Sequence, residues 1–152
     1  MCAKNLSELY VRPTYIGKIQ LLKPTNAPPE FEKWVLLVFA VESGFDPNAV
    51  SEDGALGLGQ IMPMTGRGIA EDLNHPPLSL PADLLNVDRN IQYSSYYLYK
   101  MLTRFDNNVI LMLVAYNAGP TRAEEFIKTQ QIPVETAAYI AKLMFLKERY
   151  CK

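Results

Sequence analysis

The feature that most constrains the fold is WVLLVFAV, the run from Trp34 to Val41, in which no residue carries a charge. A helix with apolar side chains on every face is stable in water only when other elements surround it. Pro28 and Pro29 precede the run and suit a helix start, where a missing N–H costs nothing. Gly44 follows it and suits a helix end. The sequence therefore predicts a buried helix over residues 30–43.

The rest of the chain predicts further helices, because no segment alternates apolar and polar residues over the length of a strand. Asp88 is expected to cap a long helix that ends near Phe105. We therefore expect a mostly α protein with little or no β-sheet. The other expected helices cover residues 64–73, Asn107 or Asn108 to Gly119, 121–129 and 133–150, the last with an inner face of Ala137, Ile140, Ala141, Met144 and Phe145.

Prolines interrupt the first part of the chain. Residues 1–29 contain four of them and are predicted to form a loop-rich arm that packs on the domain, with at most one short helical turn. Residues 30–152 are then expected to form a single domain, which is long enough to bury a full core.

Composition excludes several classes of protein. Hydrophobic residues make up 49% of the chain, charged residues 20%, and the net charge is -1, which is typical of a globular protein and gives no cationic face for nucleic acid. The longest apolar runs, 34–41 and 109–116, are too short to span a bilayer. Residues 1–10 lack the basic start and apolar block of a signal peptide, which a processed chain would also lack.

The two cysteines, Cys2 and Cys151, stand near opposite ends of the chain. A disulfide between them, two unpaired thiols, and a lipid-bearing Cys2 of a processed lipoprotein all fit this placement. The chain has two distant cysteines and one histidine, His75. These residues do not show the spacing that is typical of a metal site.

Glu42 ends the apolar helix and is the strongest candidate for chemistry. Burial disfavours a charged carboxylate, and so does the partial negative charge at a helix C-terminus. Both effects raise the pKa, so Glu42 could stay protonated near neutral pH and act as a general acid. The alternative is an exposed glutamate at a helix end, which is the commoner case.

Two further stretches suggest a cleft. Gly54, Gly57 and Gly59 alternate with apolar residues, which favours a packed wall over a free loop. A phosphate loop would need a preceding strand and a different spacing of glycines, so we exclude nucleotide binding. In VAYNAGPTR, Tyr116 and Asn117 precede a Gly-Pro break and can face a cleft, although a core tyrosine would look the same.

Four motifs in order resemble the soluble lytic transglycosylase domain, a family with a lysozyme-like fold related to goose-type lysozyme. They are ESGFDPNAVSEDGALGLGQIMP, DRNIQYSSYYL, AYNAGP and IPVETAAYI, and they cover roughly residues 30–142. The resemblance implies a single domain of several helices around a substrate groove. It also implies cleavage of the β-1,4 bond between N-acetylmuramic acid and N-acetylglucosamine in peptidoglycan, with no metal and no cofactor.

In that family the glutamate that ends the helix is the sole catalytic carboxylate, which here is Glu42. The resemblance implies that it protonates the glycosidic oxygen and then takes the proton of the C6 hydroxyl, which attacks C1 and gives a 1,6-anhydromuramyl product. The 2-acetamido group of the substrate would replace the second carboxylate of ordinary glycosidases.

The resemblance also implies substrate-binding residues. Ser51 matches a serine that binds the sugar near the scissile bond, and Gln60 and Met62 match residues that line the groove. Tyr116 matches the tyrosine that orients the acetamido group, and Asn117 supports that turn. Glu135 matches a glutamate that faces the cleft, although a carboxylate favoured by its helix dipole would look the same.

Other positions bear on this interpretation. Ser43 is expected to cap the helix and not to touch substrate. The family usually has methionine where Gly59 stands and glycine where Ser94 stands, so one wall of the groove is expected to be wider or more mobile.

The expected partner is the glycan strand of peptidoglycan, the expected location is the periplasmic side of the bacterial envelope, and the expected state is a monomer. Nucleic acid is not an expected partner, and a lipid anchor or an envelope-spanning secretion machine both remain open as attachments. Two rival functions also remain: a goose-type hydrolase with Asp53 or Glu52 as a water-positioning carboxylate, and a non-catalytic glycan-binding module.

Overall fold

The structure, a computed structural model, describes residues 13–151. This part of the chain forms eight helices, and two isolated β-bridges at Val50–Leu56 and Leu56–Ile61 stand in place of a sheet. The mostly α prediction is therefore confirmed. The helices are α2 (Pro13–Leu22), α3 (Phe31–Ser43), α4 (Pro63–Asp72), α5 (Ala82–Leu85), α6 (Val87–Arg104), α7 (Val109–Ala118), α8 (Pro120–Thr129) and α9 (Val134–Tyr150).

Helix α3 is the buried helix that the apolar run predicts. Val35, Leu37, Val38 and Phe39 are fully buried in the main core. The helix ends at Gly44, whose φ of 60° is left-handed, and the Gly44 N–H donates to the Ala40 carbonyl at 3.1 Å. Glycine adopts the left-handed conformation at a lower free-energy cost than other residues. The helix therefore ends at Gly44, as predicted.

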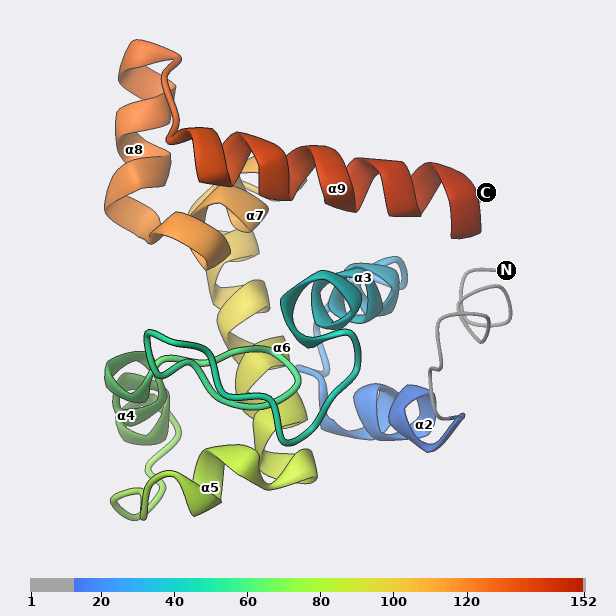
Figure 1. Cartoon of the computed structure of the whole chain (residues 1–152), viewed down its shortest axis with the longest axis vertical. Coiled ribbons are helices and arrows are strands. Elements are labelled where there is room, and N and C mark those ends of the chain that lie inside the picture. Colours follow the sequence, from blue (N-terminus) through green and yellow to red (C-terminus); the bar gives the residue numbers. More distant parts are fainter. Residues whose placement is uncertain (1–12, 152) are drawn as a thin grey trace.

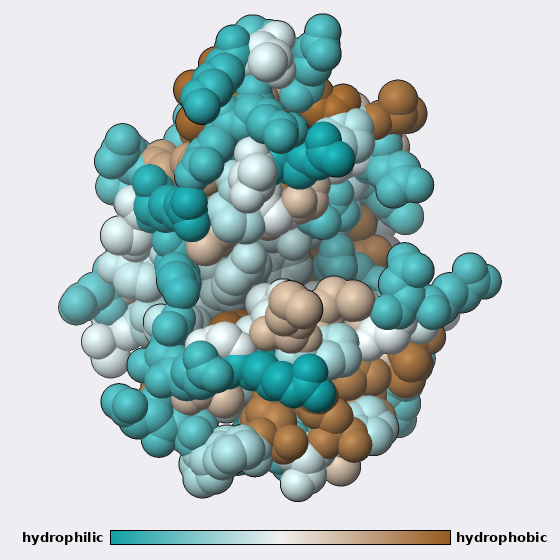
Figure 2. Space-filling model, turned by 90° about the vertical axis from the view of Figure 1, so that its left-hand side faces the viewer, coloured by the Kyte–Doolittle hydropathy of each residue, from teal (hydrophilic) through white to brown (hydrophobic). Residues whose placement is uncertain are grey.

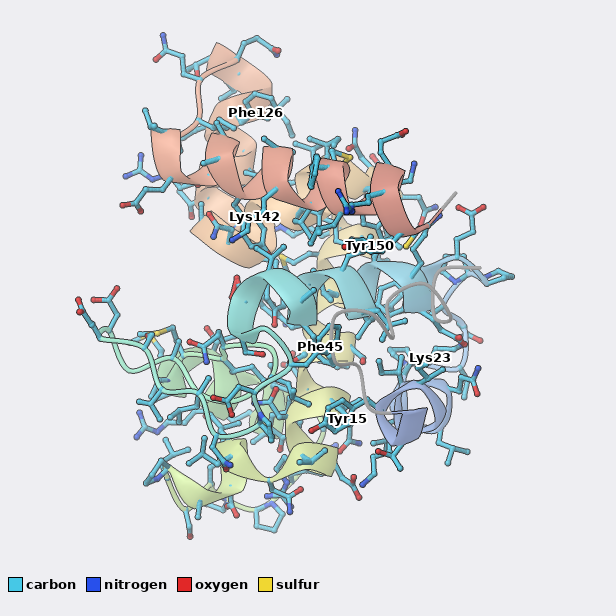
Figure 3. The ribbon with its side chains drawn as sticks, turned by 45° about the vertical axis from the view of Figure 1, so that its right-hand side comes forward. Tyr15, Lys23, Phe45, Phe126, Lys142 and Tyr150 are labelled. Carbon is cyan, nitrogen blue, oxygen red and sulfur yellow. The ribbon has the colours of Figure 1, made fainter. Side chains whose placement is uncertain are left out.

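The other helices surround α3. In Figure 1, α6 runs through the middle of the molecule, α9 crosses above α3, and the connection 44–62 and α4 lie below it. Phe45, labelled in Figure 3, follows α3 directly and is buried in the same core. The last turn of α3 therefore lies between an upper part, built by α7 to α9, and a lower part, built by the connection 44–62 and α4.

The prediction that the start of the chain is mostly loop is wrong for residues 13–22, which form α2. Tyr15 and Ile19 are one helical turn apart and are buried in the main core, and Figure 3 shows Tyr15 on the inner side of α2. Pro13 begins this helix, where a proline is tolerated. Residues 1–12 lie outside the described residues, and the division into an arm and a domain stays a prediction.

The predicted cap of the long helix is also wrong. Asn86, and not Asp88, precedes α6, and its side-chain oxygen accepts a hydrogen bond from the Arg89 N–H at 3.0 Å. Asp88 lies in the first turn, where a carboxylate is favoured by the helix dipole. The short helix α5 just before it explains the shift, because the chain turns at Asn86.

The inner face of α9 differs from the predicted one. The buried residues of α9 are Thr136, Tyr139 and Leu143. Ala137 and Ala141 are exposed, and Phe145 is 60% exposed, while Ile140 and Met144 are partly buried. The apolar pattern pointed to alanine and phenylalanine, but the helix is turned so that a threonine and a tyrosine face inward, toward the end of α3.

Within residues 13–151, no helix is long and apolar enough to cross a membrane, and no three metal-binding side chains of the histidine, cysteine or carboxylate kind gather. Cys2 lies outside the described residues, so the disulfide with Cys151 stays one of the alternatives that the sequence leaves open.

Candidate active site

A groove of about 830 Å³ opens at the last turn of α3, where Glu42 stands. Figure 2 shows that this side of the molecule is hollowed between its upper and lower parts. The lining comes from the ends of α3 and α7, the glycine-rich connection and the start of α9. It consists of Val41, Glu42, Ser51, Asp53, Ala55, Gln60, Met62, Tyr116, Asn117, Ala118, Pro133, Glu135 and Thr136.

All seven residues predicted for the site line this one groove: Glu42, Ser51, Gln60, Met62, Tyr116, Asn117 and Glu135. They come from parts of the sequence up to 93 positions apart (135 less 42), so the fold brings them together. Their individual roles toward a substrate stay predictions.

Burial sets the protonation of Glu42. Loss of hydration raises the pKa of its carboxyl from 4.5 to about 7, and the nearby Tyr139 phenol lowers it in part. Near neutral pH a large share of Glu42 is therefore protonated, which a general acid requires.

Tyr139 is a further candidate site residue, which the sequence analysis did not single out. Its hydroxyl is buried beside Glu42, and the contact falls short of a standard hydrogen bond, since this oxygen makes none among the described residues. Burial, followed by the charge of Glu42, raises the pKa of the Tyr139 phenol well above 10, so it stays a donor. A donor aimed at a carboxyl stabilises the ionised form, and this position explains the orientation of α9. The spacing from Thr136 to Tyr139 in IPVETAAYI was the available signal, because both lie on one helix face.

Tyr116 lines the groove, and its hydroxyl proton is engaged in a hydrogen bond within the protein. Its Oη donates to the Gly59 carbonyl at 2.6 Å, and its ring leans on Tyr97 with centroids 5.8 Å apart. Burial, followed by the charge of Glu42, raises the pKa of the Tyr116 phenol, so it stays protonated. The phenol oxygen remains able to accept a hydrogen bond.

Asn90 on α6 fixes the glycine-rich wall and was also missed. Its Oδ1 accepts from the Gly59 N–H at 2.9 Å, and its Nδ2 donates to the carbonyls of Leu56 at 2.9 Å and Leu84 at 2.7 Å. A Cβ at Gly57 would lie 2.4 Å from Asn90 Nδ2. Gly57 is therefore glycine because the backbone must approach this amide closely.

Gly59 and Ser94, the two departures from the family pattern, touch each other. A Cβ at Gly59 would lie 2.0 Å from Ser94 Oγ and 2.7 Å from Tyr116 Oη. The serine hydroxyl and the phenol fill the space at Gly59, so the wall is not wider at this point, and the expectation of a more mobile wall stays a prediction. The two departures are a matched pair of residues.

Hydrogen bonds hold the remaining wall residues in place. Ser43 Oγ donates to the carbonyls of Phe39 at 3.2 Å and Leu58 at 2.8 Å, and Ser43 does not line the groove, which agrees with its expected structural role. Ser51 Oγ accepts from the Ala55 N–H at 2.9 Å. The Gln60 amide nitrogen donates to two carbonyls of its own loop, at 2.9 and 3.2 Å, which leaves its oxygen for the groove.

The two acidic neighbours considered for a hydrolase differ in position. Asp53 lines the groove and Glu52 does not, although both are exposed.

The chain is similar to known proteins in sequence and in structure. A family model described as the transglycosylase SLT domain matches residues 22–137. The soluble lytic murein transglycosylase of Escherichia coli K12 is 30% identical over 118 residues, which cover 78% of this chain and 18% of that protein. The membrane-bound lytic murein transglycosylase D of Escherichia coli K12 is 30% identical over 145 residues, which cover 84% of this chain and 29% of that protein. The chain thus spans less than a third of the length of either relative.

Solved structures agree. The 70 kDa soluble lytic transglycosylase of Escherichia coli superposes with a TM-score of 0.79 at 28% identity, over 90% of this chain and 24% of that one. A 70-kDa soluble lytic transglycosylase in complex with bulgecin A gives a TM-score of 0.82 over 97% of this chain and 25% of that one, at 24% identity. The lysozyme-like fold expected from the sequence is confirmed.

The raised pKa of Glu42 predicts a stability effect. The folded-state pKa of about 7 exceeds the ordinary 4.5, so the folded protein loses stability as pH rises between these values. We expect Glu42→Gln to raise the free energy of unfolding by roughly 3 kcal/mol at pH 8 and by almost nothing at pH 4. Urea unfolding at both pH values measures the change in unfolding free energy. Glu71→Gln, at an exposed position of α4, is the control. A gain that does not grow with pH would contradict the burial of this carboxyl.

The contact between Gly59 and Ser94 predicts coupled mutations. Gly59→Ala should cost about 1–3 kcal/mol of unfolding free energy, because the new methyl group overlaps Ser94 Oγ. Ser94→Gly removes that obstacle, so the double variant should regain about 1 kcal/mol relative to the sum of the single changes. Recovery should be partial, since Tyr116 Oη still stands close. Strictly additive changes in urea unfolding would disprove the pairing.

Proposed function

The chain belongs to the transglycosylase SLT domain family, and from that premise we propose that it is a lytic transglycosylase of peptidoglycan. The bond to be cleaved is the β-1,4 link between N-acetylmuramic acid and N-acetylglucosamine. The observation that carries this proposal is the carboxyl of Glu42, which is partly buried, has a pKa raised to about 7 and lies in a groove of about 830 Å³. The names of the relatives, lytic murein transglycosylases, support the substrate.

The first step uses Glu42 as an acid. Its carboxyl donates a proton to the glycosidic oxygen, the bond from that oxygen to C1 of the muramic acid breaks, and the leaving sugar keeps the proton. Glu42 is then a carboxylate, and the Tyr139 phenol beside it stabilises that charge.

The second step uses Glu42 as a base. The carboxylate takes the proton of the C6 hydroxyl while the C6 oxygen bonds to C1, which closes a 1,6-anhydro ring. Glu42 regains its proton, so the cycle consumes no water. A pKa near 7 suits both steps, because the group must give and accept a proton at the same pH.

A single carboxylate suffices if the substrate's own 2-acetamido group stabilises the cation at C1, as in other substrate-assisted glycosidases. Tyr116 is our candidate for orienting this group. Because its proton is donated to the Gly59 carbonyl, its oxygen would accept from the acetamido N–H. The acetamido carbonyl is then left free to approach C1.

One observation favours a second candidate function. Asp53 lines the same groove and could hold a water opposite Glu42, as in a hydrolase with two carboxylates. The products of the two reactions differ, so a product assay decides between them.

The proposal places this protein at the glycan strands of the bacterial envelope, on the periplasmic side. The acid–base scheme needs no metal and no cofactor. We propose that the protein acts as a monomer. Attachment of the protein through a lipid anchor or to a secretion machine stays a proposal.

Product analysis on purified peptidoglycan tests the function. We expect wild type to release fragments with anhydro ends, about 18 Da lighter than reducing ends because no water is added. Glu42→Gln should lower the rate by at least about 100-fold. Reducing ends in place of anhydro ends would favour the hydrolase, and unchanged cleavage by Glu42→Gln would remove Glu42 from the mechanism. Binding without any cleavage by wild type would favour the non-catalytic module.

Tyr139→Phe tests the role of the phenol through pH. Activity of the wild type should fall as pH rises through about 7, since the acid form of Glu42 is lost. Removing the phenol removes a group that lowers the pKa of Glu42, so the falling limb should move to higher pH while the plateau rate drops. Tyr99→Phe, outside the groove, is the control. A reduced rate with an unmoved limb would assign Tyr139 a packing role only.

A further inference from the structure

Three polar side chains form a closed ring with the backbone of Gly59. Asn90 Oδ1 accepts a hydrogen bond from the Gly59 N–H at 2.9 Å, and the Gly59 carbonyl accepts one from Tyr116 Oη at 2.6 Å. Ser94 completes the ring, because its Oγ donates to Asn90 Oδ1 at 3.2 Å and also lies against the Tyr116 phenol. A Cβ at Gly59 would lie 2.0 Å from Ser94 Oγ and 2.7 Å from Tyr116 Oη, so the two oxygens flank one point.

The Ser94 hydroxyl has one proton and two oxygens to which it can donate. One is Asn90 Oδ1, which already accepts from the Gly59 N–H. The other is the phenol oxygen of Tyr116, whose own proton is donated to the Gly59 carbonyl. Burial and then the charge of Glu42 raise the pKa of this phenol, and a hydrogen bond with Ser94 lowers it in part, because a donor stabilises the ionised form. The serine therefore contacts the phenol as well as the amide.

Helix α6 holds Tyr116 at two points. Ser94 and Tyr97 are three positions apart in the sequence, so they lie on one face of the helix. The Tyr97 ring packs against the Tyr116 ring with centroids 5.8 Å apart, and Ser94 meets the Tyr116 hydroxyl. Ser94 is fully buried, so solvent does not compete for its hydroxyl. Both the ring and the hydroxyl of Tyr116 are therefore held by α6.

The residues that the family usually has at these two positions could not make this contact. A glycine in place of Ser94 has no hydroxyl, and a methionine in place of Gly59 would need the space that Ser94 and Tyr116 fill. The serine therefore gives the phenol of this chain a polar neighbour that the family pattern does not provide.

We propose that Ser94 is a positioning residue of the reaction, whose hydroxyl holds the Tyr116 phenol where the acetamido group of the substrate is oriented. The inference rests on the proposed function and adds a residue to it. Because the Ser94 hydroxyl can turn between the phenol and Asn90 Oδ1, it has an acceptor whether or not substrate is bound. The phenol oxygen thus stays free to accept from the acetamido N–H.

Loss of this contact should act on the chemical step. The acetamido carbonyl must approach C1 while the glycosidic bond breaks, so a small displacement of the phenol raises the barrier more than it weakens the binding of glycan. One neutral hydrogen bond corresponds to a change in rate of about 3- to 10-fold. We therefore expect a fall of this size in kcat, with KM nearly unchanged.

Ser95 supplies a matched control. It is the next residue of α6, it is also fully buried, and its hydroxyl makes no hydrogen bond among the described residues. Ser94→Ala and Ser95→Ala each remove one buried oxygen and add no atom. On soluble peptidoglycan strands, kcat for anhydro-end formation should fall about 3- to 10-fold in Ser94→Ala and stay within about 2-fold of wild type in Ser95→Ala. Equal falls in the two variants would overturn the inference.

A double variant asks whether Ser94 acts through the phenol. In a Tyr116→Phe background the contact is absent, so adding Ser94→Ala should lower kcat no further. A role in packing alone would lower kcat by the same factor in both backgrounds, and that result would overturn the inference. Urea unfolding checks that each protein compared is folded.

NMR tests the contact without any substrate. In protein with labelled tyrosine, the ring carbon that bears the hydroxyl reports on the hydrogen bonds of the phenol, and Tyr116→Phe assigns the Tyr116 signal. Ser94→Ala should shift this signal, and Ser95→Ala should leave it in place. A signal that Ser94→Ala does not move would overturn the inference.

The outcomes separate this inference from the proposed function. Anhydro ends formed at the same rate by wild type and Ser94→Ala would overturn the role of the serine while the function stands. A wild type that forms no anhydro ends would overturn the function and the inference together.

Discussion

A carboxyl group kept from water at the end of a helix is the constraint on which the rest of the structure depends. Glu42 can be held this way only because α3 is sheathed by other helices, so that Val35 to Phe39 meet almost no solvent. Gly44 then turns the chain sharply, which lets the next segment form one wall of the groove. The raised pKa of Glu42 is thus a consequence of the packing of the whole domain.

That segment has no extended sheet or helix, and the side chain of Asn90 adds hydrogen bonds to those within the segment. It pairs with the Gly59 N–H and the Leu56 carbonyl of the segment and with the Leu84 carbonyl of α5, and buried backbone groups without hydrogen bonds would be costly. Tyr116 and Ser94 complete the wall around Gly59. A groove floor made of backbone is rigid only because side chains of α6 and α7 hold it, and this rigidity places the phenol of Tyr116 beside Glu42.

Local sequence pattern was enough to predict the central helix, and the resemblance to a known family predicted the candidate site residues. The apolar run and Gly44 set the limits of α3 within one residue, and the four motifs brought the seven site residues to one groove. Local pattern failed where long-range contacts decide. The face of α9 is turned so that Tyr139 meets Glu42, against the apolar preference for Phe145.

Other misses have the same origin. Asn90 looks like an ordinary polar residue of a helix until the loop that it holds is in place. Gly59 and Ser94 look like two separate departures in the sequence, and only the fold shows that a Cβ at position 59 would lie 2.0 Å from Ser94 Oγ, so that the serine requires a glycine there. In α2, the buried pair Tyr15 and Ile19 is too short a pattern to stand out among prolines.

The most direct test of the central claim is the pKa of Glu42 itself. NMR titration of the side-chain carboxyl carbons of labelled glutamate, with Glu42→Gln to assign the signal, measures it without any substrate. We expect the Glu42 signal to titrate near pH 7. If Glu42 titrates near 4.5, its carboxyl is hydrated in solution, and neither the acid step nor the fold's role in preparing it holds.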